Sequence, residues 1–172
     1  ELYDEILSSV QAENDLVATE LSVHNGESDG PLNDACGSEH VQKQLHPPTW
    51  YTEESSASEY PYCCSLDGDA DRIVFFGQSN ETELSELLDG DKIAILIAHV
   101  LKDKFQAAAG AQDITVGIVQ TAYANGASTD YVKNTLQIPV IIAKTGVKHL
   151  HHAAVEPFDV GIYFEANGHG TV

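Results

Sequence analysis

The second half of the chain alternates apolar strand-like runs with helix-like runs, and this alternation constrains the fold more than any other feature. The strand-like runs are short and rich in β-branched residues, whereas the helix-like runs have apolar residues three and four positions apart. In order they are a turn and a helix at 85–105, a strand at 114–121, a helix at 126–136, a strand at 140–146, a helix at 147–155 and a strand at 159–170. This order is typical of an α/β protein. We predict mixed, largely parallel sheet layers flanked by helices.

The first half of the chain is less periodic. The expected elements are a helix at 2–11, a strand at 16–26 that runs into a turn, a short helix at 36–45 and a loop at 49–62. Serine hydroxyls often accept the first backbone N–H groups of a helix, so Ser38 and Ser128 are expected to cap their helices. Asp89 and Asp91 are expected to serve the positive end of the helix that follows them.

Three aspartates interrupt two apolar runs near the middle of the chain. Asp67, Asp69 and Asp71 alternate with the small residues Gly68 and Ala70. Carboxylates at every second position of a tight loop can all turn toward one hard cation, because the small residues between them leave room. The pattern therefore predicts a divalent metal site.

Four interpretations of this loop can be compared. A calcium EF-hand requires glycine at the sixth loop position and glutamate at the twelfth, and here those positions hold Arg72 and Gln78. That excludes the EF-hand. A surface turn, a phosphatase with Asp67 as its nucleophile and a magnesium site for phosphoryl transfer stay open. The magnesium site also accounts for Arg72, the only arginine of the sequence, because a guanidinium beside the metal can clamp a phosphate.

The amino-acid composition restricts the kinds of partner that this chain can bind. The formal net charge is −19, with 27 acidic and 8 basic residues, which disfavours nucleic acid and anionic membranes as partners. No apolar stretch is long enough to span a bilayer. The three cysteines, Cys36, Cys63 and Cys64, are odd in number and two are adjacent, so we expect reduced thiols and a cytoplasmic protein. The adjacent pair is expected to pack within a buried strand.

The loop "DGDADRI" resembles the metal-binding loop of the α-D-phosphohexomutases. Five segments in the same order are similar to the eukaryotic phosphoacetylglucosamine mutases of that superfamily: "CCSLDGDADRIVFF", "LDGDKIA", "VGIVQTAYANGAST", "KTGVKHLHH" and "GIYFEANGHG". The resemblance extends from Cys63 to Val172 and continues more weakly in "LNDACGSEHVQKQLHPP". It implies parts of two phosphohexomutase-type domains. Residues 1–78 would be the C-terminal part of domain 2, ending in the metal loop, and residues 79–172 a C-terminally truncated domain 3 with the sugar-recognition loop.

The resemblance also implies roles for particular residues. Asp67, Asp69 and Asp71 would bind Mg²⁺, with Arg72 beside the transferred phosphate. In the sugar-recognition loop, Glu165 and Asn167 would exchange hydrogen bonds with ring hydroxyls. The resemblance thus implies Arg72, Lys148 and His149 for catalysis, Glu165, Asn167, Gly168 and His169 for substrate binding, and Asp67, Asp69 and Asp71 for metal binding.

The implied reaction interconverts N-acetylglucosamine 6-phosphate and N-acetylglucosamine 1-phosphate through a phosphoserine enzyme and a bisphosphate, in UDP-N-acetylglucosamine biosynthesis. The implied partners are a phosphorylated amino sugar and further domains of the same enzyme. The family's Ser-His-Asn motif and its fourth-domain phosphate loop do not occur in this sequence, which has no methionine and starts at Glu1. We therefore expect a central piece of the enzyme that is inactive alone. The alternatives are an aspartyl-phosphate phosphatase and a non-catalytic module that binds divalent cations.

Overall fold

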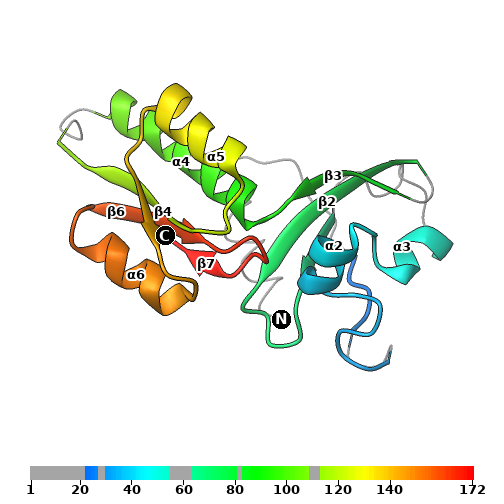
Figure 1. Ribbon diagram of the computed structural model, residues 1–172. Helices are drawn as coiled ribbons and strands as arrows, with labels where there is room; N and C mark the ends of the chain where they lie inside the picture. The colour runs from blue at the N-terminus through cyan, green and yellow to red at the C-terminus, as the bar shows by residue number, and fades with distance from the viewer. Residues whose placement is uncertain (1–21, 27–29, 55–62, 81–82, 109–112) are drawn as a thin grey trace. The chain divides into compact units, whose positions relative to one another are not determined.

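The computed structural model describes residues 22–26, 30–54, 63–80, 83–108 and 113–172 (Figure 1). The chain divides into two units, Glu1–Gly30 and Pro31–Val172, and all the described helices and strands belong to the second. The helix expected at 2–11 lies outside the described residues, as does most of the strand expected at 16–26. Residues 22–24 do not form a strand, whereas Asn25 has a φ of 56° at the expected turn.

Among the described residues of the second unit, seven strands form two sheets. The antiparallel sheet has the order β1-β2-β3, from Cys63–Leu66, Ile73–Asn80 and Glu83–Leu88. The other has the order β5-β4-β6-β7, from Val116–Thr121 (β4), Val140–Ala143 (β5), Val160–Phe164 (β6) and Gly170–Thr171 (β7). In it β4, β5 and β6 are parallel and only β7 is antiparallel. The predicted mixed α/β class is confirmed.

The helices follow the predicted alternation in the second half of the chain. They are α2 (Ser38–Gln44), α3 (Thr49–Glu54), α4 (Gly90–Ala107), α5 (Gly126–Asp130), the π-helical turn η1 (Tyr131–Leu136) and α6 (Val147–Val155). In Figure 1, α4 and α5 lie on one face of the parallel sheet and α6 lies on the other. Within the described residues, no helix has the length and apolar character that crossing a bilayer requires.

Each face of the parallel sheet has its own apolar core. On one face, Ile93 and Ala98 of α4 pack with Ile118 and Ile162 of the central strands. On the opposite face, a second cluster joins α6 to the same two strands, and its buried members are Val119, Leu150, Ala154 and Tyr163. Because both faces are covered, the ends of the strands are the parts of this sheet left to bind a ligand.

Two elements differ from the sequence prediction. The loop predicted at 49–62 is wrong for its first six residues, which form α3. Tyr51 of this helix is fully buried, with its ring edge-on to Phe76 of β2 at a centroid distance of 5.6 Å. This tertiary contact stabilises a helix that has no apolar periodicity of its own. The turn predicted from residue 85 onward is wrong for residues 85–88, which belong to strand β3 because they pair with β2.

The predicted helix caps are right at one position and wrong at two. Asp89 caps α4 by accepting a hydrogen bond from the Lys92 N–H at 3.1 Å. The Ser38 cap is wrong, because Ser38 lies inside α2 and Gly37, with φ of 93°, occupies the cap position. The Ser128 cap is also wrong, because Asn125 caps α5 and Ser128 lies in the helix.

The adjacent cysteines occupy opposite faces of β1. Cys63 is half-buried against the cluster that contains Tyr51 and Phe76, and burial raises the pKa of its thiol to about 11. Cys64 is exposed, so the prediction of a buried pair is wrong for that residue. Consecutive residues of a strand point to opposite faces, and only one face of this sheet is covered at β1 by the cluster.

Candidate functional site

The loop between β1 and β2 is folded around Asp67. Its Oδ1 atom accepts backbone hydrogen bonds from Asp71 at 3.1 Å and from Arg72 at 3.2 Å. Its carbonyl oxygen accepts the N–H of Ala70 at 3.0 Å, and Ala70 has a φ of 58°. These bonds hold the loop in one tight conformation, so the backbone of the loop positions its side chains.

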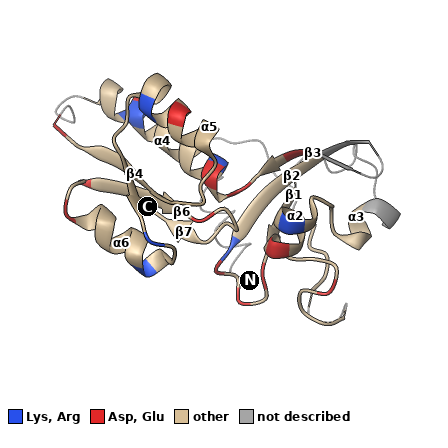
Figure 2. Ribbon diagram, viewed as in Figure 1, with Lys and Arg blue, Asp and Glu red and all other residues tan. Residues whose placement is uncertain are grey.

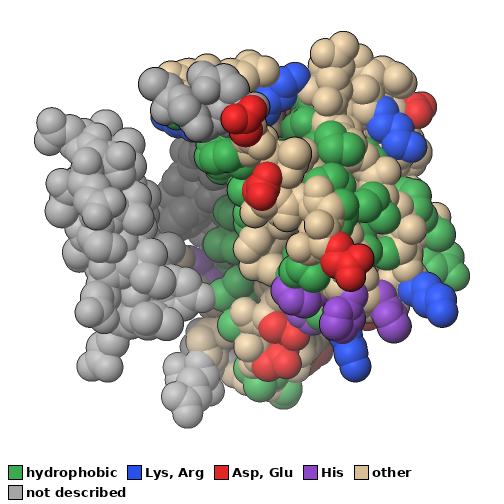
Figure 3. All heavy atoms as spheres, turned by 90° about the vertical axis from the view of Figure 1, so that its left-hand side faces the viewer, with side chains coloured by type: hydrophobic (Ala, Val, Ile, Leu, Met, Phe, Trp, Pro, Cys, Tyr) green, Lys and Arg blue, Asp and Glu red, His purple; other side chains and the backbone are tan. Residues whose placement is uncertain are grey.

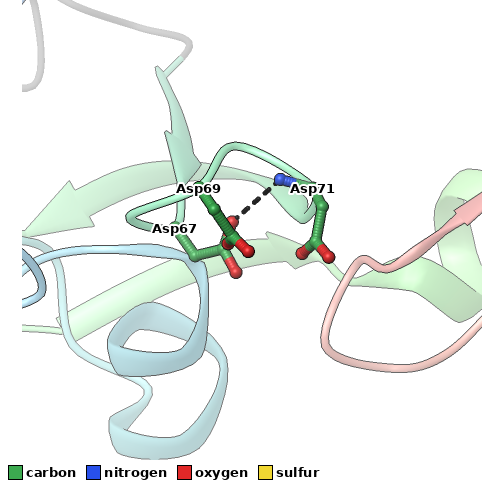
Figure 4. Close-up of side chains that lie close together, drawn as sticks. All are labelled: Asp67, Asp69 and Asp71. Carbon is green, nitrogen blue, oxygen red and sulfur yellow. Dashed lines mark hydrogen bonds between the residues drawn. The ribbon is translucent and has the colours of Figure 1, made fainter.

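The three predicted metal ligands converge in this loop. One oxygen each from Asp67, Asp69 and Asp71 lies within 4.8 Å of the others. Figure 4 shows the three carboxylates on the same side of the loop, and Figure 2 shows the acidic character of this segment. Three hard oxygen donors at this separation fit a Mg²⁺ or Ca²⁺ ion. Such ions bind carboxylate oxygens at metal–oxygen distances of about 2.0–2.6 Å.

Arg72 lies among carboxylates from two different elements. Its Nε atom is 3.4 Å from Oδ2 of Asp67 and 3.7 Å from Oδ1 of Asp71. Its terminal Nη1 donates to Oε2 of Glu39 in α2 at 3.2 Å. Glu39 also pairs with Lys43, and hydrogen bonding to Lys43, with a smaller contribution from Arg72, lowers the pKa of its carboxyl. Glu39 could not be predicted as a partner of Arg72, because the two residues are 33 positions apart in the sequence.

The segment Glu165–Gly170 makes a tight hairpin between β6 and β7. The Glu165 N–H donates to the carbonyl of His169 at 2.8 Å, and the Gly168 N–H donates to that of Glu165 at 2.9 Å. Asn167 Oδ1 accepts the N–H of His169 at 3.1 Å. All four predicted substrate-binding residues therefore belong to one tight turn at the carboxyl end of β6.

The hairpin at 165–170, predicted as the sugar-recognition loop, is bonded directly to the aspartate loop, predicted as the metal loop. Arg72 and His169 form an antiparallel bridge, and the N–H of Ile73 donates to the carbonyl of Gly168 at 3.3 Å. Gly168 has a φ of 91°, and a Cβ atom there would lie 2.0 Å from the carbonyl oxygen of Ile73. Only glycine allows the two loops to approach this closely. His169 Nε2 also lies 3.6 Å from Oδ2 of Asp71.

Glu165 connects the sugar-recognition loop to the loop that follows β5. Its Oε1 atom accepts the backbone N–H of Gly146 at 2.9 Å. Lys148 and His149 come next, as exposed residues in the first turn of α6. Figure 3 shows histidine side chains gathered near lysine on the face that includes α6. Within the described part of the chain, neither Lys148 nor His149 has a hydrogen bond or ion pair to the metal loop.

The first two residues of α4 hold two strand-end loops. The N–H of Gly90 donates to the carbonyl of Ala166 at 3.2 Å, and a Cβ at Gly90 would lie 1.8 Å from the carbonyl oxygen of Glu165. Asp91 Oδ2 accepts the N–H of Asn125 at 2.8 Å. Burial raises the pKa of Asp91, although the Asn125 N–H opposes the shift. The sequence predicted Asp91 only as a helix-end residue, because its partner lies 34 positions away.

Comparison with known proteins decides the family. Residues 89–172 match the family model described as phosphoacetylglucosamine mutase AMG1, domain III. The chain is 48% identical over 160 residues to the phosphoacetylglucosamine mutase of Saccharomyces cerevisiae and 46% identical over 151 residues to that of Homo sapiens. The chain is homologous to part of the phosphoacetylglucosamine mutases, and residues 89–172 correspond to their domain III. The resemblance of the aspartate loop and the four later segments is thereby confirmed.

This chain aligns with only part of the length of each of these relatives. The alignment with the S. cerevisiae phosphoacetylglucosamine mutase covers 92% of this chain and 28% of that protein. The alignment with the human enzyme covers 88% of this chain and 26% of that protein. The chain therefore spans between a quarter and a third of the length of these curated relatives.

Solved structures agree with this assignment. The N-acetylphosphoglucosamine mutase of Aspergillus fumigatus, solved with GlcNAc-6P and magnesium, is 47% identical, with a TM-score of 0.72 over 81% of this chain and 27% of that one. An N-acetylglucosamine-phosphate mutase described as a member of the α-D-phosphohexomutase superfamily has a TM-score of 0.70 at 45% identity, over 81% of this chain and 26% of that one. A relative with magnesium and the carboxylate triad together support a divalent-metal site in this chain.

Proposed function

We propose that this chain forms the metal-binding and sugar-recognition part of a phosphoacetylglucosamine mutase, which interconverts N-acetylglucosamine 6-phosphate and N-acetylglucosamine 1-phosphate. The observation that carries the proposal is the junction of the two loops. The carbonyl of Gly168 accepts the N–H of Ile73, and Arg72 bridges to His169. A phosphate near the aspartates and a sugar near Glu165 would then belong to one ligand.

Mg²⁺ would be held by the carboxylates of Asp67, Asp69 and Asp71. When bound there, the ion would supply positive charge to offset the charge of a transferring phosphoryl group. Arg72 lies against two of these carboxylates, so its guanidinium can donate hydrogen bonds to a phosphate that approaches the same place.

The sugar would be recognised by the hairpin that contains Glu165 and Asn167. Both side chains are anchored, since Glu165 Oε1 accepts the Gly146 N–H and Asn167 Oδ1 accepts the His169 N–H. Their second polar atoms, a carboxylate oxygen and an amide nitrogen, can accept from and donate to ring hydroxyls. The sugar must bind in two orientations for a 6-phosphate and a 1-phosphate to interconvert. We expect these contacts to reach hydroxyls that occupy equivalent places in both.

Lys148 and His149 are our candidates for the proton transfer that accompanies attack by a sugar hydroxyl. They follow Gly146, whose N–H is fixed by Glu165, so the sugar-recognition loop and the first turn of α6 have a common anchor. A base or acid of this kind has to come within hydrogen-bond reach of the reacting hydroxyl.

The remaining parts of the reaction belong to other domains of the proposed enzyme. A phosphoserine would donate its phosphoryl group to the sugar and regain one from the bisphosphate. In this proposal residues 1–78 belong to domain 2, residues 79–172 belong to domain 3, and the enzyme is cytoplasmic. Because such catalysis depends on groups positioned by several domains, we expect no mutase turnover from this chain alone.

The phosphatase alternative requires a free carboxylate at Asp67. Both of its oxygens have partners within the loop: Oδ1 accepts two backbone N–H groups and Oδ2 lies 3.4 Å from Arg72 Nε. This environment suits an anchored metal ligand better than a nucleophile.

One experiment compares these functions. The chain is incubated with Mg²⁺ and N-acetylglucosamine 1,6-bisphosphate, and both phosphate release and binding of the sugar phosphate are followed by NMR. We expect binding without release. Steady phosphate release would support the phosphatase, and binding of Mg²⁺ without any sugar phosphate would support the non-catalytic module.

A further inference from the structure

One strand-end loop is supported by most of the buried polar groups of the fold. Six polar or charged side chains are buried among the described residues, namely Ser38, Ser65, Asp91, Gln120, Thr121 and Ser128. Of the last four, Thr121 and Ser128 belong to the segment 121–129, which connects β4 to α5 and begins that helix, and Asp91 and Gln120 are hydrogen-bonded to it. Burying polar groups costs free energy unless each is hydrogen-bonded. The clustering of these buried polar groups around one loop indicates that they hold its backbone in a fixed position.

Gln120 fixes the far side of the loop. Its side chain, only 2% exposed, donates from Nε2 to Ser128 Oγ at 2.8 Å and accepts at Oε1 from Thr129 Oγ1 at 2.7 Å. The last residues of β4 are thereby tied to the first turn of α5. A fully paired buried network of this kind rigidifies what it holds.

Thr121 and Asp91 fix the near side. The Thr121 Oγ1 atom accepts the N–H of Tyr123 at 3.3 Å, and its carbonyl accepts the N–H of Ala124 at 3.1 Å. Asp91, 4% exposed, accepts the N–H of Asn125 at 2.8 Å. The backbone between Thr121 and Asn125 is therefore held at its start, in its middle and at its end.

Tyr123 lies on this rigid loop and is 85% exposed, the highest exposure of any large apolar residue in the described part of the chain. A phenol ring in water on a mobile loop would need no explanation, but this backbone is anchored by four buried groups. An exposed aromatic side chain on a fixed loop is typical of a surface that is covered when a ligand binds.

The loop lies at the edge where the proposed ligand binds. Strand β4 is the neighbour of both β5 and β6, whose own carboxyl-end loops contain Gly146 and Glu165. Gly90 and Asp91, consecutive in α4, hold the sugar-recognition loop at Ala166 and the Tyr123 loop at Asn125. Ligands of α/β sheets bind at the carboxyl ends of the strands, where these loops meet.

We propose that Tyr123 is a specificity-determining residue that packs its ring against the C–H face and the acetamido methyl group of a bound phosphorylated N-acetylamino sugar. The proposal rests on the proposed function above, since it needs a sugar phosphate at the same strand ends. Tyrosine suits the role because its ring offers an apolar face to C–H groups, while its hydroxyl stays hydrated at the rim. The anchored loop reduces the entropy lost when the ring meets the sugar.

Saturation-transfer difference NMR tests the proposal, with N-acetylglucosamine 6-phosphate as the probe, Mg²⁺ present and the chain as it is. Signals of the acetamido methyl and ring protons report which part of the ligand touches the protein. The variants are Tyr123→Ala, Tyr123→Phe and, as a matched control on η1, Tyr131→Ala, because Tyr131 is 41% exposed. Circular dichroism checks that each variant is folded.

We expect Tyr123→Ala to weaken binding about five- to tenfold, the size of one aromatic contact, and to reduce the acetamido methyl signal most. Tyr123→Phe, which keeps the ring, should bind within about twofold of the native chain, as should Tyr131→Ala. If native chain and Tyr123→Ala bind equally well, the role of Tyr123 is wrong while the proposed function stands. If the native chain binds Mg²⁺ but no sugar phosphate, the proposed function fails and the role of Tyr123 with it.

Discussion

The imidazole Nε2 atom of His169 lies 3.6 Å from Oδ2 of Asp71, so the proposed sugar-recognition loop and the proposed metal loop meet through side chains as well as through backbone. The contact accompanies the Arg72–His169 bridge. Glu165, at the other end of the same hairpin, is directed to Gly146 instead. Substitutions at His169 should therefore affect both metal and sugar binding, whereas those at Glu165 should mainly affect the sugar.

Replacing Asp69 with Asn should weaken Mg²⁺ binding. The substitution keeps the size of the side chain but removes one of the three negative charges that converge within 4.8 Å. Calorimetric titration with Mg²⁺ should show a loss of about tenfold or more, because hard cations depend on the charge of their oxygen ligands. Asp130→Asn is the control, since Asp130 is an exposed aspartate of α5 with no side-chain cap bond. Equal affinities in Asp69→Asn and the native chain would remove Asp69 from the site.

Glu39 should influence the metal site through Arg72. When Glu39→Gln removes the charge that holds Nη1 at 3.2 Å, the guanidinium can turn fully to Asp67 and Asp71 and compete with the cation. We expect Mg²⁺ affinity to fall about two- to fivefold, in the range of exposed ion pairs. Lys43→Ala, which removes the other partner of Glu39, is the matched control.

A double-mutant cycle separates this effect from a general loss of negative charge. In an Arg72→Ala background, Glu39→Gln should no longer change Mg²⁺ affinity, because the residue that transmits its effect is gone. If Glu39→Gln changed Mg²⁺ affinity equally in both backgrounds, Glu39 would act on the cation through its own negative charge and not through Arg72.

Replacing Gly168 with Ala should destabilise the junction of the two loops. A Cβ atom there would lie 2.0 Å from the Ile73 carbonyl oxygen, and φ is 91°, so the backbone has to shift. We expect a loss of about 2–4 kcal/mol in unfolding free energy, measured by urea denaturation. Gly126→Ala is the control, because a Cβ at that helical position meets nothing within 4 Å and should be neutral or stabilising by up to about 1 kcal/mol. Similar losses in both variants would contradict the close approach.

The sequence predicted the second half of the fold well, and the reasons are local. The strands β4, β5 and β6 and the helices α4 and α6 all have periodic apolar patterns in their own residues. Strand β3 and helix α3 were missed because their order depends on partners elsewhere, β2 for the first and Phe76 for Tyr51 in the second.

The candidate site shows the same division. The aspartate triad could be predicted because its three members are two positions apart and the backbone of one loop positions them. The pairs Glu39–Arg72 and Gly146–Glu165 could not, since they join residues 33 and 19 positions apart. Spacing within a sequence carries no information about such contacts until the fold brings the segments together.

Buried Asp91 should make stability depend on pH. Burial raises its pKa above the value of 3.8 for the unfolded chain. Between that value and the raised pKa of the folded state, the unfolded chain releases the proton first. The contribution of Asp91 to the free energy of unfolding is therefore fully present below the pKa of the unfolded chain. It is lost as the pH rises through the pKa of the folded chain.

The comparison with Asp91→Asn isolates this group. Asparagine can still accept the Asn125 N–H but carries no charge. The unfolding free energy of the variant relative to the native chain should therefore rise as the pH increases above 3.8 and through the raised pKa of Asp91. All other titrating groups are common to both proteins. If the difference in unfolding free energy between Asp91→Asn and the native chain did not change with pH, the pKa of Asp91 would not be raised in the folded state.

The central claim is that the metal loop and the sugar-recognition loop form one site for one ligand. Calorimetric titration of N-acetylglucosamine 6-phosphate into the chain, with and without Mg²⁺, tests it most directly. We predict that Mg²⁺ tightens sugar-phosphate binding, that the sugar phosphate tightens Mg²⁺ binding by the same factor, and that Asp69→Asn removes this coupling. Sugar-phosphate affinity that is the same with and without Mg²⁺ would contradict the claim.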